Sequence, residues 1–117
     1  MGRVVMILRK VPYGDINAAE AVRHAMGGAA DELDIDLVLV DGGVLIAKKG
    51  QDETGTGFTN LEAVIKDCID LGVAVYADGQ SLKDQHLEPG DITEGVRIAD
   101  RTGIADIVAS GKSTMIF

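Results

Sequence analysis

The chain contains five short runs in which nearly every residue is apolar. They span residues 4–8, 37–40, 73–77, 96–99 and 114–117. Continuous runs rich in Val, Ile and Leu are typical of strands that are covered on both faces, as in parallel sheets. The pattern therefore predicts five buried strands in one parallel sheet.

Apolar residues recur at helical spacing between the first and second runs. Asn17 and Glu20 have the spacing of a capping box at the start of this segment. The apolar stripe that follows consists of Ala18, Val22, Ala25, Ala29 and Leu33. We therefore expect a helix here that turns one face toward the sheet.

A second helix is predicted before the third run. Thr59 and Glu62 form its capping box, and Gly72 closes it. Its inward face is expected to consist of Leu61, Val64, Ile65, Cys68 and Leu71.

Two shorter helices are predicted in the last third of the chain. Ser81 and Asp84 indicate that one begins at Ser81. Asp100 is expected to cap the other, which runs to Gly111 through the apolar residues Ile104, Ile107 and Val108.

Strands and helices thus alternate, with connections long enough for right-handed crossovers. This order predicts an α/β fold in the form of a three-layer α/β/α sandwich around a five-stranded parallel sheet. Residues 1–117 contain no stretch long enough to be a linker, so we expect a single domain.

The connection after Asp41 contains four consecutive apolar residues, Val44 to Ala47, in what we expect to be a short helix. A single turn that is apolar on every side cannot hide all of them against its own sheet. We therefore predict that Val44, Leu45 and Ile46 contact another subunit of an oligomer.

Charge and cysteine content narrow the classes of function. The formal net charge is -8 and the basic residues are scattered, which argues against nucleic acid as a direct partner. The single cysteine cannot form an internal disulfide, and the N-terminus does not look like a secretion signal, so we expect a cytoplasmic protein. No apolar run approaches the roughly 18 residues of a membrane span.

Two incomplete motifs invite enzymatic interpretations. "SGKST" at residues 110–114 resembles part of a phosphate-binding loop, but Asp106 stands where a glycine is needed and a strand follows the lysine. An aspartate after the third strand resembles the phosphoacceptor of a receiver domain. That chemistry requires an acidic pair after the first strand, where this chain has Arg9 and Lys10.

Ligands of open parallel sheets gather at the carboxyl ends of the strands. The polar residues predicted at those ends are Arg9, Lys10, Tyr13, Asp41, Asp78 and Ser81. We expect them to form a cleft. The alternative is that they are ordinary loop residues, with Asp41 and Asp78 serving turns before glycines.

Cys68 has the spacing of a core residue on its helix, and apolar burial raises a thiol pKa, so we interpret it as packing rather than catalysis. His24 and His86 each lack a second ligand at metal spacing. We expect no metal and no other cofactor. The carboxylates of "DELDID" (31–36) look like a solvated helix end that leads into a strand.

Five stretches together resemble the DsrE/DsrF-like family, and within it the DsrF (TusC) type. They are "RKVPYG" (9–14), "AAEAVRHAMGGAAD" (18–31), "DLVLVDGGV" (36–44), "KKGQDETGTGF" (48–58) and "VYADGQSLKDQHL" (75–87). The resemblance implies the fold known as DsrEFH-like or YchN-like. It also implies trimers or hexamers, either of one chain or with DsrE-like and DsrH-like subunits.

The resemblance further implies a role in intracellular sulfur relay, for sulfur oxidation or the thiolation of transfer RNA. In DsrE-type members a cysteine just after the third strand carries the sulfur, and Asp78 holds the matching position here. A carboxylate cannot hold a persulfide. We therefore expect a non-catalytic docking subunit that acts beside a cysteine-bearing sulfur carrier protein. The alternatives are a stand-alone sulfurtransferase that uses Cys68, and a homo-oligomeric protein that binds a small anion or nucleotide.

Overall fold

The computed structural model describes residues 3–9, 17–31, 34–49 and 61–117. Its strands are β1 (Arg3–Leu8), β2 (Asp34–Leu39), β3 (Ala74–Asp78), β4 (Arg97–Ala99) and β5 (Ser113–Ile116). Its α-helices are α1 (Asn17–Ala30), α2 (Leu61–Asp70), α3 (Gly79–Asp84) and α4 (Arg101–Ser110). Two 3-10 helices, η1 (Asp41–Ala47) and η2 (Pro89–Asp91), complete these elements.

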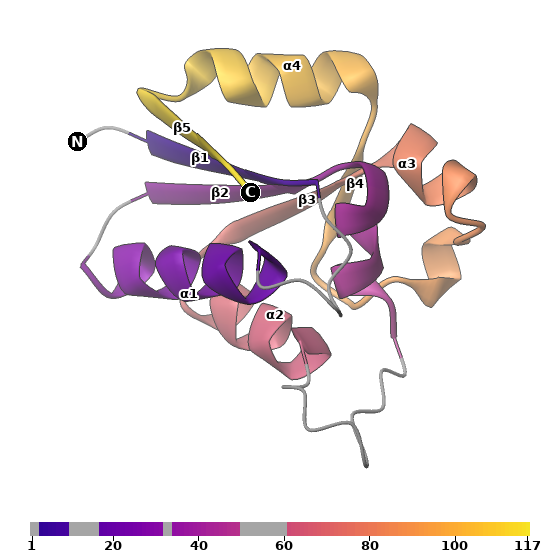
Figure 1. Ribbon diagram of the computed structural model, residues 1–117, viewed down its shortest axis with the longest axis horizontal. Coiled ribbons are helices and arrows are strands. Elements are labelled where there is room, and N and C mark those ends of the chain that lie inside the picture. Colours follow the sequence, from indigo (N-terminus) through magenta and orange to yellow (C-terminus); the bar gives the residue numbers. More distant parts are fainter. Residues whose placement is uncertain (1–2, 10–16, 32–33, 50–60) are drawn as a thin grey trace.

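The five strands form one sheet in the order β4-β3-β2-β1-β5, and all neighbours are parallel. The predicted five-stranded parallel sheet is therefore confirmed, but the prediction that all five strands are buried is wrong, because β5 is exposed and β4 is mostly exposed at the two edges of the sheet. Each of the five apolar runs overlaps one strand, with shifts of one to three residues at the ends. Helices α1 and α2 lie on one face of the sheet and α4 lies on the other (Figure 1), which confirms the three layers.

The two faces of the sheet differ in what they bury. Met6, Leu37 and Val75 lie side by side in register and belong to one apolar core with the inward residues of α1 and α2. On the opposite face Val5 lies beside Asp36, and both are almost fully buried. Helix α4 covers this second face, yet none of its own residues is buried.

The C-terminus of α2 shows why Gly72 closes it. Gly72 has a φ of +97°, a conformation that a side chain disfavours. Its N–H donates to the carbonyl of Ile69, and the N–H of Val73 donates to the carbonyl of Cys68, as in a Schellman motif. Leu71 lies in this turn and is 50% exposed. The prediction that Leu71 belongs to the inward face of the helix is therefore wrong.

The predicted short helix after Asp41 is present as η1, but its apolar side chains are not left at the surface. Val44, Ile46 and Ala47 are fully buried within this chain, and only Leu45 is partly accessible. Helices α2 and α3 both contact η1, so it is enclosed from several sides rather than by the sheet alone. The expectation that Val44 and Ile46 are available for a subunit contact is wrong.

Helix α3 begins earlier than predicted. Its cap is Asp78, the last residue of β3, whose side chain accepts a hydrogen bond from the N–H of Ser81. Ser81 is therefore the third residue of the helix and not its cap. The predicted Asp100 cap of α4 is confirmed, because its carboxylate accepts a bond from the N–H of Gly103 at 2.7 Å. The predicted cap Thr59 lies outside the described residues.

Candidate functional site

Three strand ends meet where the sequence predicts a cleft. Arg9 directly follows β1, Asp41 comes two residues after the end of β2, and Asp78 ends β3. Arg9 Nε lies 3.5 Å from Asp41 Oδ2, and both side chains are largely exposed. The structure thus brings Arg9, Asp41, Asp78 and Ser81 together, while Lys10 and Tyr13 lie outside the described residues.

Ser81 links two of these strand ends through hydrogen bonds. Its hydroxyl donates to Asp78 Oδ2 at 2.6 Å and accepts from the backbone N–H of Asp41 at 2.8 Å. Ser81 is only 3% exposed. Both bonding directions of the hydroxyl are therefore used inside the protein. This arrangement holds the ends of β2 and β3 together and leaves no free serine nucleophile.

The backbone of η1 is fitted closely against the end of β1. Asp41 has a φ of +50°, in the left-handed region that side chains other than Asn and Asp seldom adopt. A Cβ on Gly43 would lie 2.2 Å from the carbonyl oxygen of Leu8, so only glycine fits there. These two positions fix where the Asp41 carboxylate stands relative to Arg9.

A small pocket of about 180 Å³ opens beside this cluster. It is lined by Arg9, Asp41, Ile116 and Phe117. The N–H of Arg9 donates to the carbonyl of Phe117 at 2.9 Å, which ties the end of β1 to the end of β5. The charges of Arg9 and Asp41 offset each other at the mouth of this pocket.

Cys68 lies in the core between α2 and α1. It has no exposed surface, and its Sγ lies 3.9 Å from the carbonyl oxygen of Val22. Burial, and to a lesser extent the nearby carboxylate of Asp67, raises the pKa of the thiol from 9.0 to about 11. Since the thiolate is the reactive form, the site suppresses reactivity. The predicted core position of Cys68 is confirmed.

Among the described residues neither histidine belongs to a group that could hold a metal ion. His24 is about half exposed and lies on α1, with its ring 5.6 Å from that of Phe117, and His86 is exposed in the turn after α3. Within the described parts of the chain, no group of three His, Cys, Asp or Glu side chains could hold a metal ion.

One polar pair was missed in the sequence. Asp36 is 2% exposed, and its carboxylate lies 3.0 Å from Arg3 Nη1. The interpretation of residues 31–36 as uniformly solvated is therefore wrong at Asp36. The alternation of Asp34, Ile35 and Asp36 could have indicated that two carboxylates share one sheet face, although nothing in it identifies Arg3 as the partner.

Comparison with known proteins decides the family. The family model described as the DsrE/DsrF-like family matches residues 2–117. The chain belongs to the DsrE/DsrF-like family. The intracellular sulfur oxidation protein DsrF of Allochromatium vinosum is 36% identical over 87 residues, which cover 74% of this chain and 64% of that protein.

Other similar proteins match this chain over nearly its full length. An uncharacterized protein of Methanocaldococcus jannaschii is 26% identical over 98% of this chain and 99% of its own length. The fold matches the ychN protein from E. coli with a TM-score of 0.91 at 22% identity, covering all of both chains. A protein of unknown function from Methanobacterium thermoautotrophicum matches over all of both chains with a TM-score of 0.76 at 19% identity.

Proposed function

We propose that this chain is a non-catalytic docking subunit of an intracellular sulfur-relay complex, in which a partner protein carries the sulfur on cysteine. Its membership of the DsrE/DsrF-like family and its similarity to a DsrF protein named for sulfur oxidation support this role. Service in sulfur oxidation or in the thiolation of transfer RNA would use the same docking function.

The state of the single thiol carries the proposal. Sulfur relay needs a thiolate that can attack one persulfide and be attacked in turn. Cys68 is fully buried with a raised pKa, and Asp78 at the end of β3 is engaged with Ser81. The chain therefore lacks an accessible carrier, and a cysteine of another protein must supply one.

The experiment compares the native chain with Asp78→Cys. Each is incubated with a low-molecular-weight persulfide donor and weighed intact by mass spectrometry. We expect no added sulfur on the native chain and added sulfur on the variant, because the variant places a thiol at a strand end. Asp78→Asn, which keeps an oxygen acceptor for the helix cap, is the matched control without a thiol.

The competing function is a stand-alone sulfurtransferase that uses Cys68. Near-stoichiometric sulfur on Cys68 of the folded native chain would establish it and overturn the docking role. The docking role also requires a complex. Mixing the native chain with a cysteine-bearing relay protein should give a stable assembly in light scattering and speed sulfur delivery to that cysteine.

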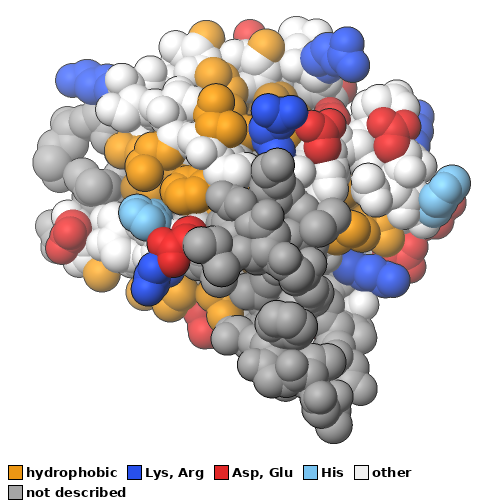
Figure 2. Space-filling view, in the orientation of Figure 1, with side chains coloured by type: hydrophobic (Ala, Val, Ile, Leu, Met, Phe, Trp, Pro, Cys, Tyr) orange, Lys and Arg blue, Asp and Glu red, His pale blue; other side chains and the backbone are white. Residues whose placement is uncertain are grey.

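We further propose that the chain forms oligomers through the edge of β5. Among the described strands β5 has a sheet neighbour on one side only, and Met115 and Ile116 are 36% and 65% exposed. Hydrophobic side chains gather in this part of the surface in Figure 2. An exposed apolar edge strand without charges is prone to pair with another chain. A second copy would cover both side chains.

Light scattering on Ile116→Asp tests this interface. We expect a lower mass than for the native chain, because a buried unpaired charge opposes association. Leu71→Asp, at an exposed leucine at the C-terminus of α2, is the control and should keep the native mass. The same mass for Ile116→Asp as for the native oligomer would exclude β5.

A further inference from the structure

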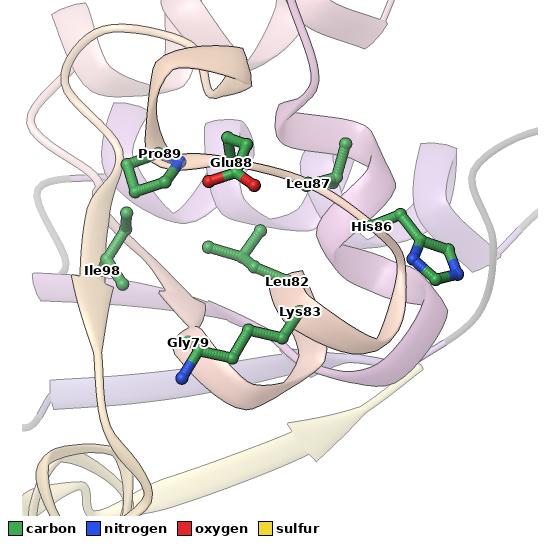
Figure 3. A pocket seen from close by; sticks show the side chains of 8 residues that line it. All are labelled: Gly79, Leu82, Lys83, His86, Leu87, Glu88, Pro89 and Ile98. Atoms are coloured by element: carbon green, nitrogen blue, oxygen red, sulfur yellow. The ribbon is translucent and has the colours of Figure 1, made fainter.

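A second, larger pocket lies at the opposite edge of the sheet from β5. It is formed between α3, the segment that leads into η2, and β4, and it has a volume of about 430 Å³ (Figure 3). This size is within the range of roughly 300–1,000 Å³ that is usual for small-molecule sites. No residue of the Arg9, Asp41 and Ser81 cluster lines it.

The interior of this pocket is apolar. Leu82 and Leu87 are 3% and 8% exposed, and Pro89 adds a rigid ring to the wall. Ile98 of β4 faces the same space and is 46% exposed. An aliphatic group placed against Ile98 would therefore remove apolar surface of that side chain from water, while Leu82 and Leu87, which are already buried, form an apolar floor beneath it.

Two opposite charges flank the apolar surface. In Figure 3 the carboxylate of Glu88 and the ammonium of Lys83 lie on opposite sides of Leu82, and the ring of His86 points away from the pocket. The ion pairs found in the described parts of the chain include neither Lys83 nor Glu88. The nearby Asp84 already accepts a bond from Gln80.

Glu88 has capacity for a further partner. Its side chain accepts the backbone N–H of Asp91 in the capping box of η2, and the Asp91 carboxylate accepts the N–H of Glu88 at 2.9 Å. A carboxylate has about four acceptor positions, so this bond leaves others open. Lys83 offers three donors.

We propose that this pocket binds a small zwitterion whose ammonium and carboxylate groups stand at opposite ends of an aliphatic body. The ammonium pairs with Glu88, the carboxylate pairs with Lys83, and the body covers the exposed side chain of Ile98. A ligand with a single charge would satisfy one flank and leave the other charge without a partner. The chemistry therefore selects for both charges together.

Three probes with the same number of carbon atoms test the selection: 6-aminohexanoate, hexanoate and hexylamine, each titrated into the full chain at pH 7. Binding is followed by the backbone amide NMR shifts of Gly79, Leu87 and Ile98. We expect 6-aminohexanoate to bind at least about threefold more tightly than either other probe, as partly exposed ion pairs allow. Equal affinities for the three probes, or shifts that avoid these amides, would overturn the proposal.

Two variants test which charged group of the ligand pairs with Lys83 and which pairs with Glu88. Lys83→Gln should remove the advantage of 6-aminohexanoate over hexylamine, and Glu88→Gln should remove its advantage over hexanoate. Gln at position 88 keeps an oxygen for the helix cap, and unchanged thermal unfolding confirms that each variant folds. Lys112→Gln and Glu94→Gln, which lie outside the pocket lining, are the matched controls and should keep native affinities. Native selectivity in both pocket variants would contradict the assignment.

Discussion

The two faces of the sheet are built on different chemistry. The face under α1 and α2 is apolar, and its buried side chains, which include Met6 and Cys68, are fully or almost fully removed from water. The face under α4 combines Val5 and Val38 with the Arg3 and Asp36 ion pair, and its helix buries none of its own residues. Stability should therefore be concentrated on the first face.

The largest expected difference in stability is between two Ile→Ala substitutions, one in α2 on the first face and one in α4 on the second face. Ile65→Ala in α2 removes a fully buried side chain and should lower the free energy of unfolding by about 3 kcal/mol. Ile107→Ala in α4 removes a partly exposed one and should cost about 1 kcal/mol. Denaturant unfolding measures both. Equal losses would show that the two faces contribute alike.

Burial of Cys68 in the first face should make the free energy of unfolding fall at alkaline pH. Because folding raises its pKa from 9.0 to about 11, the folded state holds a proton that the unfolded state loses in this window. Its contribution is complete below pH 9 and should fall by up to about 2 kcal/mol as the pH rises to 11. Denaturant unfolding at several pH values should show a steeper loss for the native chain than for Cys68→Ala. Parallel pH profiles would contradict burial of the thiol.

On the second face, Arg3→Met leaves the Asp36 carboxylate buried without its cation. Since Arg3 is half exposed and water can reach the vacated space, we expect a loss of about 1–2 kcal/mol in denaturant unfolding. Arg23→Met, in the exposed pair with Glu20, should be indistinguishable from the native chain. A neutral Arg3→Met would mean that Asp36 is satisfied by other groups.

The strand-end cluster should show the smallest effects. Ser81→Ala removes the hydroxyl that joins the Asp41 N–H to the Asp78 carboxylate and should cost about 1 kcal/mol. Arg9→Gln breaks an exposed pair, and its unfolding midpoint should not move. If Arg9→Gln were the more costly of the two, Ser81 would not be the main link between the strand ends.

The sequence predicts the sheet well because each strand contains a short apolar run, although it does not show that the edge strands β4 and β5 are largely exposed. It also places Arg9, Asp41, Asp78 and Ser81 at one edge, since parallel strands share a carboxyl end. The start of α3 was misplaced because β3 passes into the helix without a loop, so Asp78 ends one element and caps the next.

Tertiary contacts explain the other errors. The burial of Val44 and Ile46 depends on α2 and α3 closing over η1, and local spacing does not reveal such enclosure. The buried carboxylate of Asp36 likewise finds its partner in Arg3, which is 33 positions away in the chain. In both cases the deciding neighbour is distant in sequence.

The pairing of β5 with β1 joins strands from opposite ends of the described chain. During synthesis β1 can pair with β2 early, but its other side must wait until residues near Ile116 have left the ribosome. Closing such a distant contact is slow compared with forming local ones. The nascent chain therefore exposes one side of β1 until β5 has been made, and an unpaired strand edge of this kind can pair with another chain.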